Sequence, residues 1–192
     1  MFYKTSVYIA DILEEQNRFT ADDKEVYRYG IQQGLNLILN ILTTLIIGCF
    51  CGMIYQSILF LICYIPLRIF CGGYHAKTHL CCYICSIIMI TCILLVTKHL
   101  SFNMLVYEVF VLLSLITILV LAPVEDKNKK LDNNEKRVFR KRACILTFLE
   151  VLLFHIFCII HFMFCYKIVF MALLSLSILM IIGQIKNYNS QS

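Results

Sequence analysis

Six apolar stretches, each long enough to cross a bilayer, constrain this 192-residue chain more than any other feature. A helix needs about 20 apolar residues to cross roughly 30 Å of hydrocarbon. Only 15% of the residues are charged, whereas soluble domains are about 25% charged. The sequence therefore predicts an all-α polytopic membrane protein that forms a single membrane-embedded domain over residues 1–192. The six predicted transmembrane helices are 31–50, 53–70, 80–98, 103–122, 143–162 and 165–184.

The first 30 residues are more polar than the rest and have an amphipathic pattern. Ile9 and Ile12 share one helical face, and Thr20 begins a capping-box pattern that predicts a helix from Ala21. We expect an amphipathic helical segment over 1–30 that lies along the membrane surface. A solvated leader without a role is the alternative. Acidic residues interrupt the start before any apolar core, so we expect no cleavable signal peptide.

The positions of lysine and arginine predict the orientation in the membrane. With both termini inside, fifteen of the seventeen Lys and Arg residues lie in inner segments, and only Lys98 and Lys167 lie outside. Inner loops of membrane proteins carry such an excess of cations. We therefore expect both termini and the loop over 68–80 to face the cytoplasm.

One hydrophilic loop, over residues 122–142, carries eight of these cations. A basic segment next to a span is typical of contact with anionic lipid, and a docking surface for an acidic peptide tail is the alternative. The net charge of +5 is concentrated in this loop and the cytoplasmic flanks. It therefore indicates topology and lipid contact, and no nucleic-acid partner is expected.

The stretch 68–86 (RIFCGGYHAKTHLCCYICS) is chemically the richest part of the chain. A cysteine needs a nearby base or an electropositive site to act as a thiolate nucleophile. His75 and Cys82 would lie about 10.5 Å apart along a continuous helix, which is beyond hydrogen-bond reach. A reacting pair therefore requires a break in the helix, which Gly72 and Gly73 permit. Thr78 then caps the next helix and places Cys82 near its positive end.

A metal site is the competing hypothesis for the same stretch. His75, His79, Cys82 and Cys85 have side chains that tetrahedral zinc accepts. Their spacing suits a continuous helix, so this hypothesis leaves the glycine pair unexplained. A third alternative is a polar interface loop without chemistry.

Three further residues are candidates for supporting the site. Ser86 shares the helical face of Cys82 and could donate to an oxyanion, although a bond to its own helix backbone is favoured. Arg68 lies at the inner end of its span, where it could reach lipid phosphate or hold a substrate carboxylate. Glu150 is costly inside a span. It either orients His75 or makes a structural interhelical hydrogen bond.

The run R-x-x-x-G-G-x-H-A-x-x-x-x-x-C resembles the signature of the accessory gene regulator B (AgrB) family. The later segment APVEDKNKKL resembles the loop that follows the fourth span in that family. Chain length, hydropathy and the order of the two motifs also match. The residues that carry the first motif are Arg68, Gly72, Gly73, His75, Ala76 and Cys82.

The resemblance implies a multi-pass endopeptidase of the bacterial cell membrane that acts in quorum sensing. Such proteins remove the C-terminal part of an AgrD-like propeptide and promote thiolactone or lactone macrocyclisation. By this resemblance Cys82 is the nucleophile, His75 is the base, and Arg68 and Gly73 support the site. It also implies a homodimer. We expect no cofactor and no metal for such an enzyme.

Two rival functions stay open at this point. The first is a metal-binding or transport protein that uses the His and Cys cluster. The second is a membrane scaffold for a signalling partner, without enzymatic activity.

Overall fold

The computed structural model describes residues 7–9, 11–12, 24–74, 78–125 and 132–189. Six long helices account for most of these residues, and each contains a segment long and apolar enough to cross a membrane. The all-α membrane fold is therefore confirmed. The helices are α2 (Lys24–Phe50), α3 (Ile54–Cys71), α4 (His79–His99), α5 (Met104–Leu121), α6 (Asn133–Ile159) and α7 (Met163–Asn189).

Four of the six predicted spans agree with the observed helices to within a few residues, and two do not. The helix α2 begins at Lys24, well before the predicted span, whereas the predicted helix start at Ala21 lies outside the described residues. The helix α6 begins at Asn133, so the prediction of a loop through residue 142 is wrong. The physical reason is a capping box, in which the Asp132 backbone N–H donates to Glu135 Oε2 over 3.0 Å. The basic residues after it are helical.

The chain divides into two compact units by its internal contacts. One comprises Met1–Ile47 with Ala76–Ile90, and the other comprises Gly48–His75 with Thr91–Ser192. The helix α4 therefore begins in the first unit and ends in the second.

A hydroxyl network joins α2 to the first half of α4 within the first unit. The Thr43 hydroxyl donates to the Leu39 backbone oxygen over 2.8 Å, and Thr43 Oγ1 lies 2.8 Å from the Tyr83 hydroxyl. Because the single proton of Thr43 goes to Leu39, Tyr83 donates to Thr43. This bond holds the two helices together between apolar surfaces.

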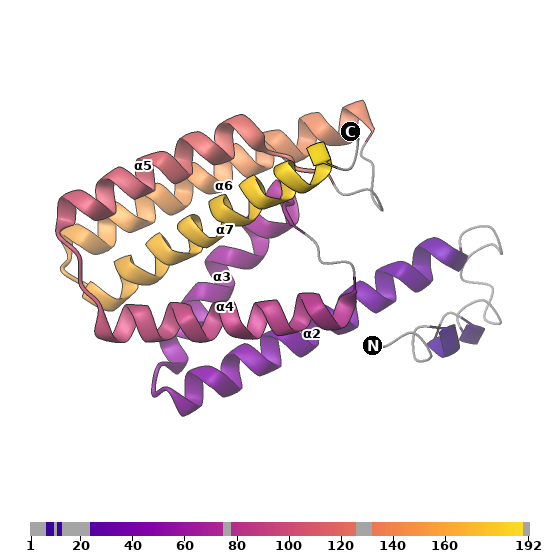
Figure 1. Ribbon diagram of the computed structural model, residues 1–192, viewed down its shortest axis with the longest axis horizontal. Coiled ribbons are helices and arrows are strands. Elements are labelled where there is room, and N and C mark those ends of the chain that lie inside the picture. The colour runs from indigo at the N-terminus through magenta and orange to yellow at the C-terminus, as the bar shows by residue number, and fades with distance from the viewer. Residues whose placement is uncertain (1–6, 10, 13–23, 75–77, 126–131, 190–192) are drawn as a thin grey trace. The chain divides into compact units, whose positions relative to one another are not determined.

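The second unit is a bundle in which α7 packs against α3, α5 and α6. Figure 1 shows α5, α6 and α7 lying side by side. Leu173, Leu176 and Met180 of α7 are completely buried, and Ser177 bonds Ser114 of α5 over 3.2 Å. The buried face of α7 organises this unit because it contacts all three of its partners.

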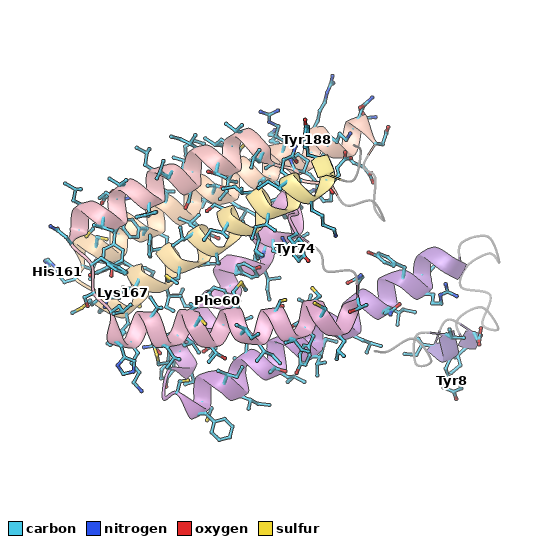
Figure 2. The ribbon with its side chains drawn as sticks, viewed as in Figure 1. Tyr8, Phe60, Tyr74, His161, Lys167 and Tyr188 are labelled. Atoms are coloured by element: carbon cyan, nitrogen blue, oxygen red, sulfur yellow. The ribbon has the colours of Figure 1, made fainter. Side chains whose placement is uncertain are left out.

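The two cations that the sequence places outside are both bonded at one end of this unit. Lys98 Nζ donates to the Cys51 backbone oxygen over 2.9 Å. Lys167 Nζ donates to the Leu100 backbone oxygen over 2.9 Å and to Ser101 Oγ over 2.8 Å. Carbonyl oxygens beyond helix ends lack intrahelical donors. The two lysines therefore satisfy them. Lys167 lies at the opposite end of α7 from Tyr74 (Figure 2).

Candidate functional site

The helix α3 ends at Cys71 and is followed by an extended segment, Gly72–Tyr74, which we call the glycine strap. Gly72 has a φ of 70° and Gly73 a φ of 124°, and residues other than glycine rarely adopt such values. The next helix does not begin until His79. The predicted interruption of the helix is therefore confirmed.

The glycine strap lies directly against the segment Ala122–Glu125 that follows α5. The Val124 N–H donates to the Cys71 backbone oxygen over 2.8 Å, and Gly72 and Val124 form a parallel β-bridge. A Cβ atom at position 72 would lie 2.1 Å from the Val124 oxygen. Gly72 is thus required by its backbone angle and by this close approach. The two segments that resemble the family's motifs meet at this point.

Arg68 fixes the glycine strap from the α3 side. Its Nη1 donates to the Gly72 oxygen over 2.6 Å, and its Nη2 donates to the Tyr74 oxygen. A Cβ atom at position 73 would lie 2.2 Å from Nη1. The planar guanidinium therefore bonds two carbonyls of the chain itself, a role that neither sequence-based hypothesis for Arg68 included.

The helix α7 fixes the glycine strap from the other side. The Tyr74 N–H donates to the Leu179 oxygen over 2.9 Å, and Lys186 Nζ lies 5.1 Å from the centre of the Tyr74 ring. Both backbone polar groups of Tyr74, which is labelled in Figure 2, are therefore bonded. His75 comes next in the chain and lies outside the described residues, as does Ala76.

Thr78 caps the N-terminus of α4, as the sequence predicts. Its Oγ1 accepts a bond from the Cys81 N–H over 3.2 Å, and its carbonyl accepts one from the Cys82 N–H over 3.1 Å. Cys82 is half-buried and lies at the end of the first turn. A helix N-terminus carries partial positive charge, which stabilises negative groups close to it.

Ser86 bonds the backbone of its own helix. Its hydroxyl donates to the Cys82 oxygen over 3.0 Å, so the favoured alternative from the sequence is confirmed. Cys81 and Cys85 are both exposed beside Cys82. Three thiols therefore lie within two turns of α4.

The continuous helix that the metal hypothesis favours is not present, because Thr78 is a cap and α4 begins at His79. Among the described residues, no group of three His, Cys, Asp or Glu side chains is arranged to hold a metal ion. His75 and the side chain of His79 lie outside that part of the chain, so the complete ligand set stays untested.

Glu150 lies on α6 with only 7% of its surface exposed. The helix α6 packs against α3 and α7. Within the part of the chain that the structure describes, Glu150 Oε2 has no hydrogen-bond partner. The structural hydrogen bond expected from the sequence is thus not found at this oxygen, and a role beside His75 stays a prediction.

Three residues around the glycine strap were not predicted as site residues from the sequence. Val124 bonds the end of α3, Gly183 packs against the strap, and Asn187 Nδ2 donates to the Glu125 oxygen over 2.7 Å. Glu125 also pairs with Lys136 over 3.1 Å. Of the three, only Gly183 could have been recognised from the sequence. A glycine inside an apolar helix lowers helix stability by about 1 kcal/mol relative to alanine, so its presence usually has a packing reason.

Comparison with known proteins agrees with the two motifs. The family model described as accessory gene regulator B matches residues 6–184. Two AgrB-like proteins of Clostridium perfringens align over 164 residues, which are 79% of this chain and 77% of each relative. The protein of strain SM101 / Type A is 26% identical and that of strain 13 / Type A is 27% identical. No solved structure matches. The chain belongs to the accessory gene regulator B family.

Proposed function

We propose that this protein is a membrane cysteine endopeptidase that cleaves an AgrD-like propeptide and promotes its macrocyclisation. Family membership gives the chain a role in the accessory gene regulator system and an AgrD-related partner. The observation that carries the finer proposal is the position of Cys82, in the capped first turn of α4 after a helix interrupted by two glycines. A straight helix would have kept His75 and Cys82 apart.

The first chemical step forms an acyl-enzyme. His75 takes the proton of the Cys82 thiol, and the thiolate attacks the carbonyl carbon of the scissile peptide bond. When the resulting tetrahedral intermediate collapses, the C–N bond breaks and the leaving amine takes the proton from His75. The N-terminal part of the propeptide then remains bound to Cys82 as a thioester.

The second step transfers the acyl group within the substrate. A thiol or hydroxyl of the propeptide attacks the thioester carbonyl and gives its proton to His75. The C–S bond to Cys82 breaks, the thiolate regains a proton, and a thiolactone or lactone ring is released. Because a thioester is also open to hydrolysis, the ring forms efficiently only where water is excluded. The inner end of an apolar span suits this requirement.

Arg68, Gly72 and Gly73 support the reaction by fixing the backbone of the segment that precedes His75 in the sequence. Their roles follow from the bonds of the glycine strap, in which Arg68 fastens both ends to α3. A guanidinium fork is well suited to this task because it presents two donors in a fixed geometry. Arg68 is therefore proposed as a positioning residue that does not touch the substrate.

We also propose the orientation that the lysine and arginine positions indicate and the assembly that the family resemblance implies. Both termini, the strap and the start of α6 face the cytoplasm, and the protein is a homodimer. Within the second unit the segments Gly72–Tyr74 and Ala122–Glu125 lie at the same end as Lys186, which agrees with alternating spans. The exposed cations at the start of α6 would then contact anionic lipid on the inner surface.

The test is cleavage of an AgrD-type propeptide by the full chain in reconstituted membranes. Wild type is compared with Cys82→Ser and His75→Ala, each with and without a chelator, while Cys92→Ser controls for loss of an exposed thiol elsewhere on α4. The proposal expects both site variants to lose cleavage, and it expects wild type and Cys92→Ser to cleave with or without chelator. Cleavage that stops with chelator would instead support the metal hypothesis. Full activity in both site variants would refute the thiol mechanism.

A further inference from the structure

Gly183, two turns before the end of α7, lies against the glycine strap. It is buried, and a Cβ atom built on it would lie 2.8 Å from Gly73 C and 2.8 Å from Tyr74 N. Ordinary Cβ contacts are longer than 3.4 Å. Both neighbouring atoms belong to the backbone, so they cannot turn aside as the tip of a side chain could. Any side chain at position 183 therefore displaces the strap or the helix.

A glycine at this place is not a requirement of the helix itself. Glycine destabilises a helix interior by about 1 kcal/mol relative to alanine. Gly34, inside α2, meets nothing within 4 Å of its would-be Cβ atom. The difference shows that Gly183 occupies a site of close backbone approach, whereas Gly34 does not.

The same face of α7 also forms a hydrogen bond with the strap. Leu179 lies one turn before Gly183, so the two residues share a face. The Leu179 oxygen accepts the Tyr74 N–H over 2.9 Å. On the far side of the strap, the Tyr74 oxygen accepts a bond from Arg68. Tyr74 is thus held between α3 and α7.

We propose that Gly183 is a positioning residue for the reaction, because it lets the strap lie on α7 and so sets where the backbone enters His75. This inference rests on the proposed function, in which His75 is the base. Gly183 touches neither the substrate nor Cys82 in this role. It acts through the backbone of Gly73 and Tyr74, and a displacement of about 1 Å at a reacting group can lower a rate roughly a hundredfold.

The experiment uses Gly183→Ala and Gly183→Val in the full chain in reconstituted membranes, with Gly34→Ala as the matched control. Two assays are run. The first measures the kcat and KM of propeptide cleavage, and the second measures the alkylation rate of the Cys82 thiol by mass spectrometry. We expect kcat to fall roughly tenfold in the alanine variant and roughly a hundredfold in the valine variant, with KM changed less than twofold. Gly34→Ala should match wild type in both assays.

A second set of measurements repeats Gly183→Ala in a His75→Ala background. If Gly183 acts through His75, the alkylation rate of Cys82 falls in each single variant and falls no further in the double variant. An alkylation rate in the double variant that differs from that of His75→Ala would show that Gly183→Ala acts by a route other than His75, and would overturn this role of Gly183. Equal alkylation of wild type and His75→Ala would refute the proposed function, because His75 would then not activate Cys82. A fall in His75→Ala but none in Gly183→Ala would refute the role of Gly183 alone.

Asn187→Asp keeps the inference testable if Gly183→Ala fails to fold. This change removes the donor that bonds the Glu125 oxygen on the segment against which the strap lies. Gln184→Glu is its control, because it makes the same amide-to-acid change at an exposed position of α7. We expect kcat to fall roughly fivefold in Asn187→Asp, as for a lost hydrogen bond, and not in Gln184→Glu. Equal kcat values in both variants would count against positioning by α7.

Discussion

The two halves of the signature stretch are stabilised in different ways. The glycine strap, Gly72–Tyr74, is held by residues distant in the chain, among them Val124, Leu179 and Gly183. The start of α4 is held by local bonds, from Thr78 to Cys81 and Cys82 and from Ser86 back to Cys82. The proposed base, His75, therefore follows a segment that is held by tertiary contacts. The proposed nucleophile, Cys82, lies in a helix whose first turn is held by hydrogen bonds among neighbouring residues.

This difference teaches how substitutions should act on each half. A change in the glycine strap alters a backbone path that contacts α3, α7 and the segment after α5, so it should affect both stability and activity. A change around Cys82 alters one helical turn, so it should affect activity with little change in stability. Five substitutions test this contrast, from the largest expected effect to the smallest.

Cys82→Ala should give the largest effect on activity. Loss of a nucleophile typically costs roughly 10⁴-fold or more in kcat, and the half-buried side chain is small enough that the thermal unfolding midpoint should hardly change. Propeptide cleavage and the midpoint are measured on the same membranes. Cys81→Ala and Cys85→Ala are the matched controls, and cleavage retained in Cys82→Ala but lost in one of them would move the nucleophile to that residue.

Gly72→Ala should destabilise the second unit and lower cleavage with it. A backbone with a φ of 70° and a ψ of −143°, a combination adopted almost only by glycine, costs an alanine about 1–3 kcal/mol, and its Cβ atom would also lie 2.1 Å from the Val124 oxygen. Gly52→Ala is the matched control, because Gly52 has a similar φ of 68° but meets nothing within 4 Å. The unfolding midpoint should fall further in Gly72→Ala. Equal midpoints would show that the close approach to Val124 has no energetic weight.

Arg68→Lys should lower cleavage by an intermediate amount. Lysine keeps the charge that would reach lipid phosphate, but it cannot bond both the Gly72 and Tyr74 oxygens in one geometry. Loss of one hydrogen bond to a charged group costs about 1.5–3 kcal/mol, so a roughly tenfold or larger fall in cleavage is expected. Arg137→Lys, at an exposed position of α6, is the control. Unchanged cleavage in Arg68→Lys would favour the lipid-facing role.

Features held by local bonds could be predicted from the sequence, whereas features held by tertiary contacts could not. The number of spans, the bounds of four of them, the break at Gly72 and Gly73 and the cap at Thr78 were predictable, because each depends on local pattern or local backbone preference. The glycine strap's partners were not, because nothing local in the sequence relates Val124 or Gly183 to residues more than 45 positions earlier. The start of α6 was missed for another reason. Its capping box at Asp132 was readable, but the charge of the segment favoured a loop.

Thr78→Ala should have a small effect confined to the first turn of α4. Loss of a capping side chain costs about 1 kcal/mol of helix stability, and fraying there would loosen the geometry around Cys82. We expect cleavage to fall a few-fold while the unfolding midpoint of the whole protein changes little. Thr78→Ser retains the oxygen that accepts the Cys81 N–H, so it should behave as wild type. A loss of activity in both variants would mean that the threonine methyl group matters more than the cap.

Ser86→Ala should give the smallest effect, and it sharpens the contrast because it separates a local bond from a catalytic one. The Ser86 hydroxyl donates to the Cys82 backbone oxygen within the same helix, a bond that contributes little to helix stability. Cleavage should therefore change less than about twofold, since only a back-bond is lost. Removal of a true oxyanion donor lowers kcat roughly 10²–10³-fold. A loss of that size would mean that the Ser86 hydroxyl breaks its bond to the Cys82 oxygen during the reaction and donates to the oxyanion instead. The start of α4 would then not be held by local bonds alone.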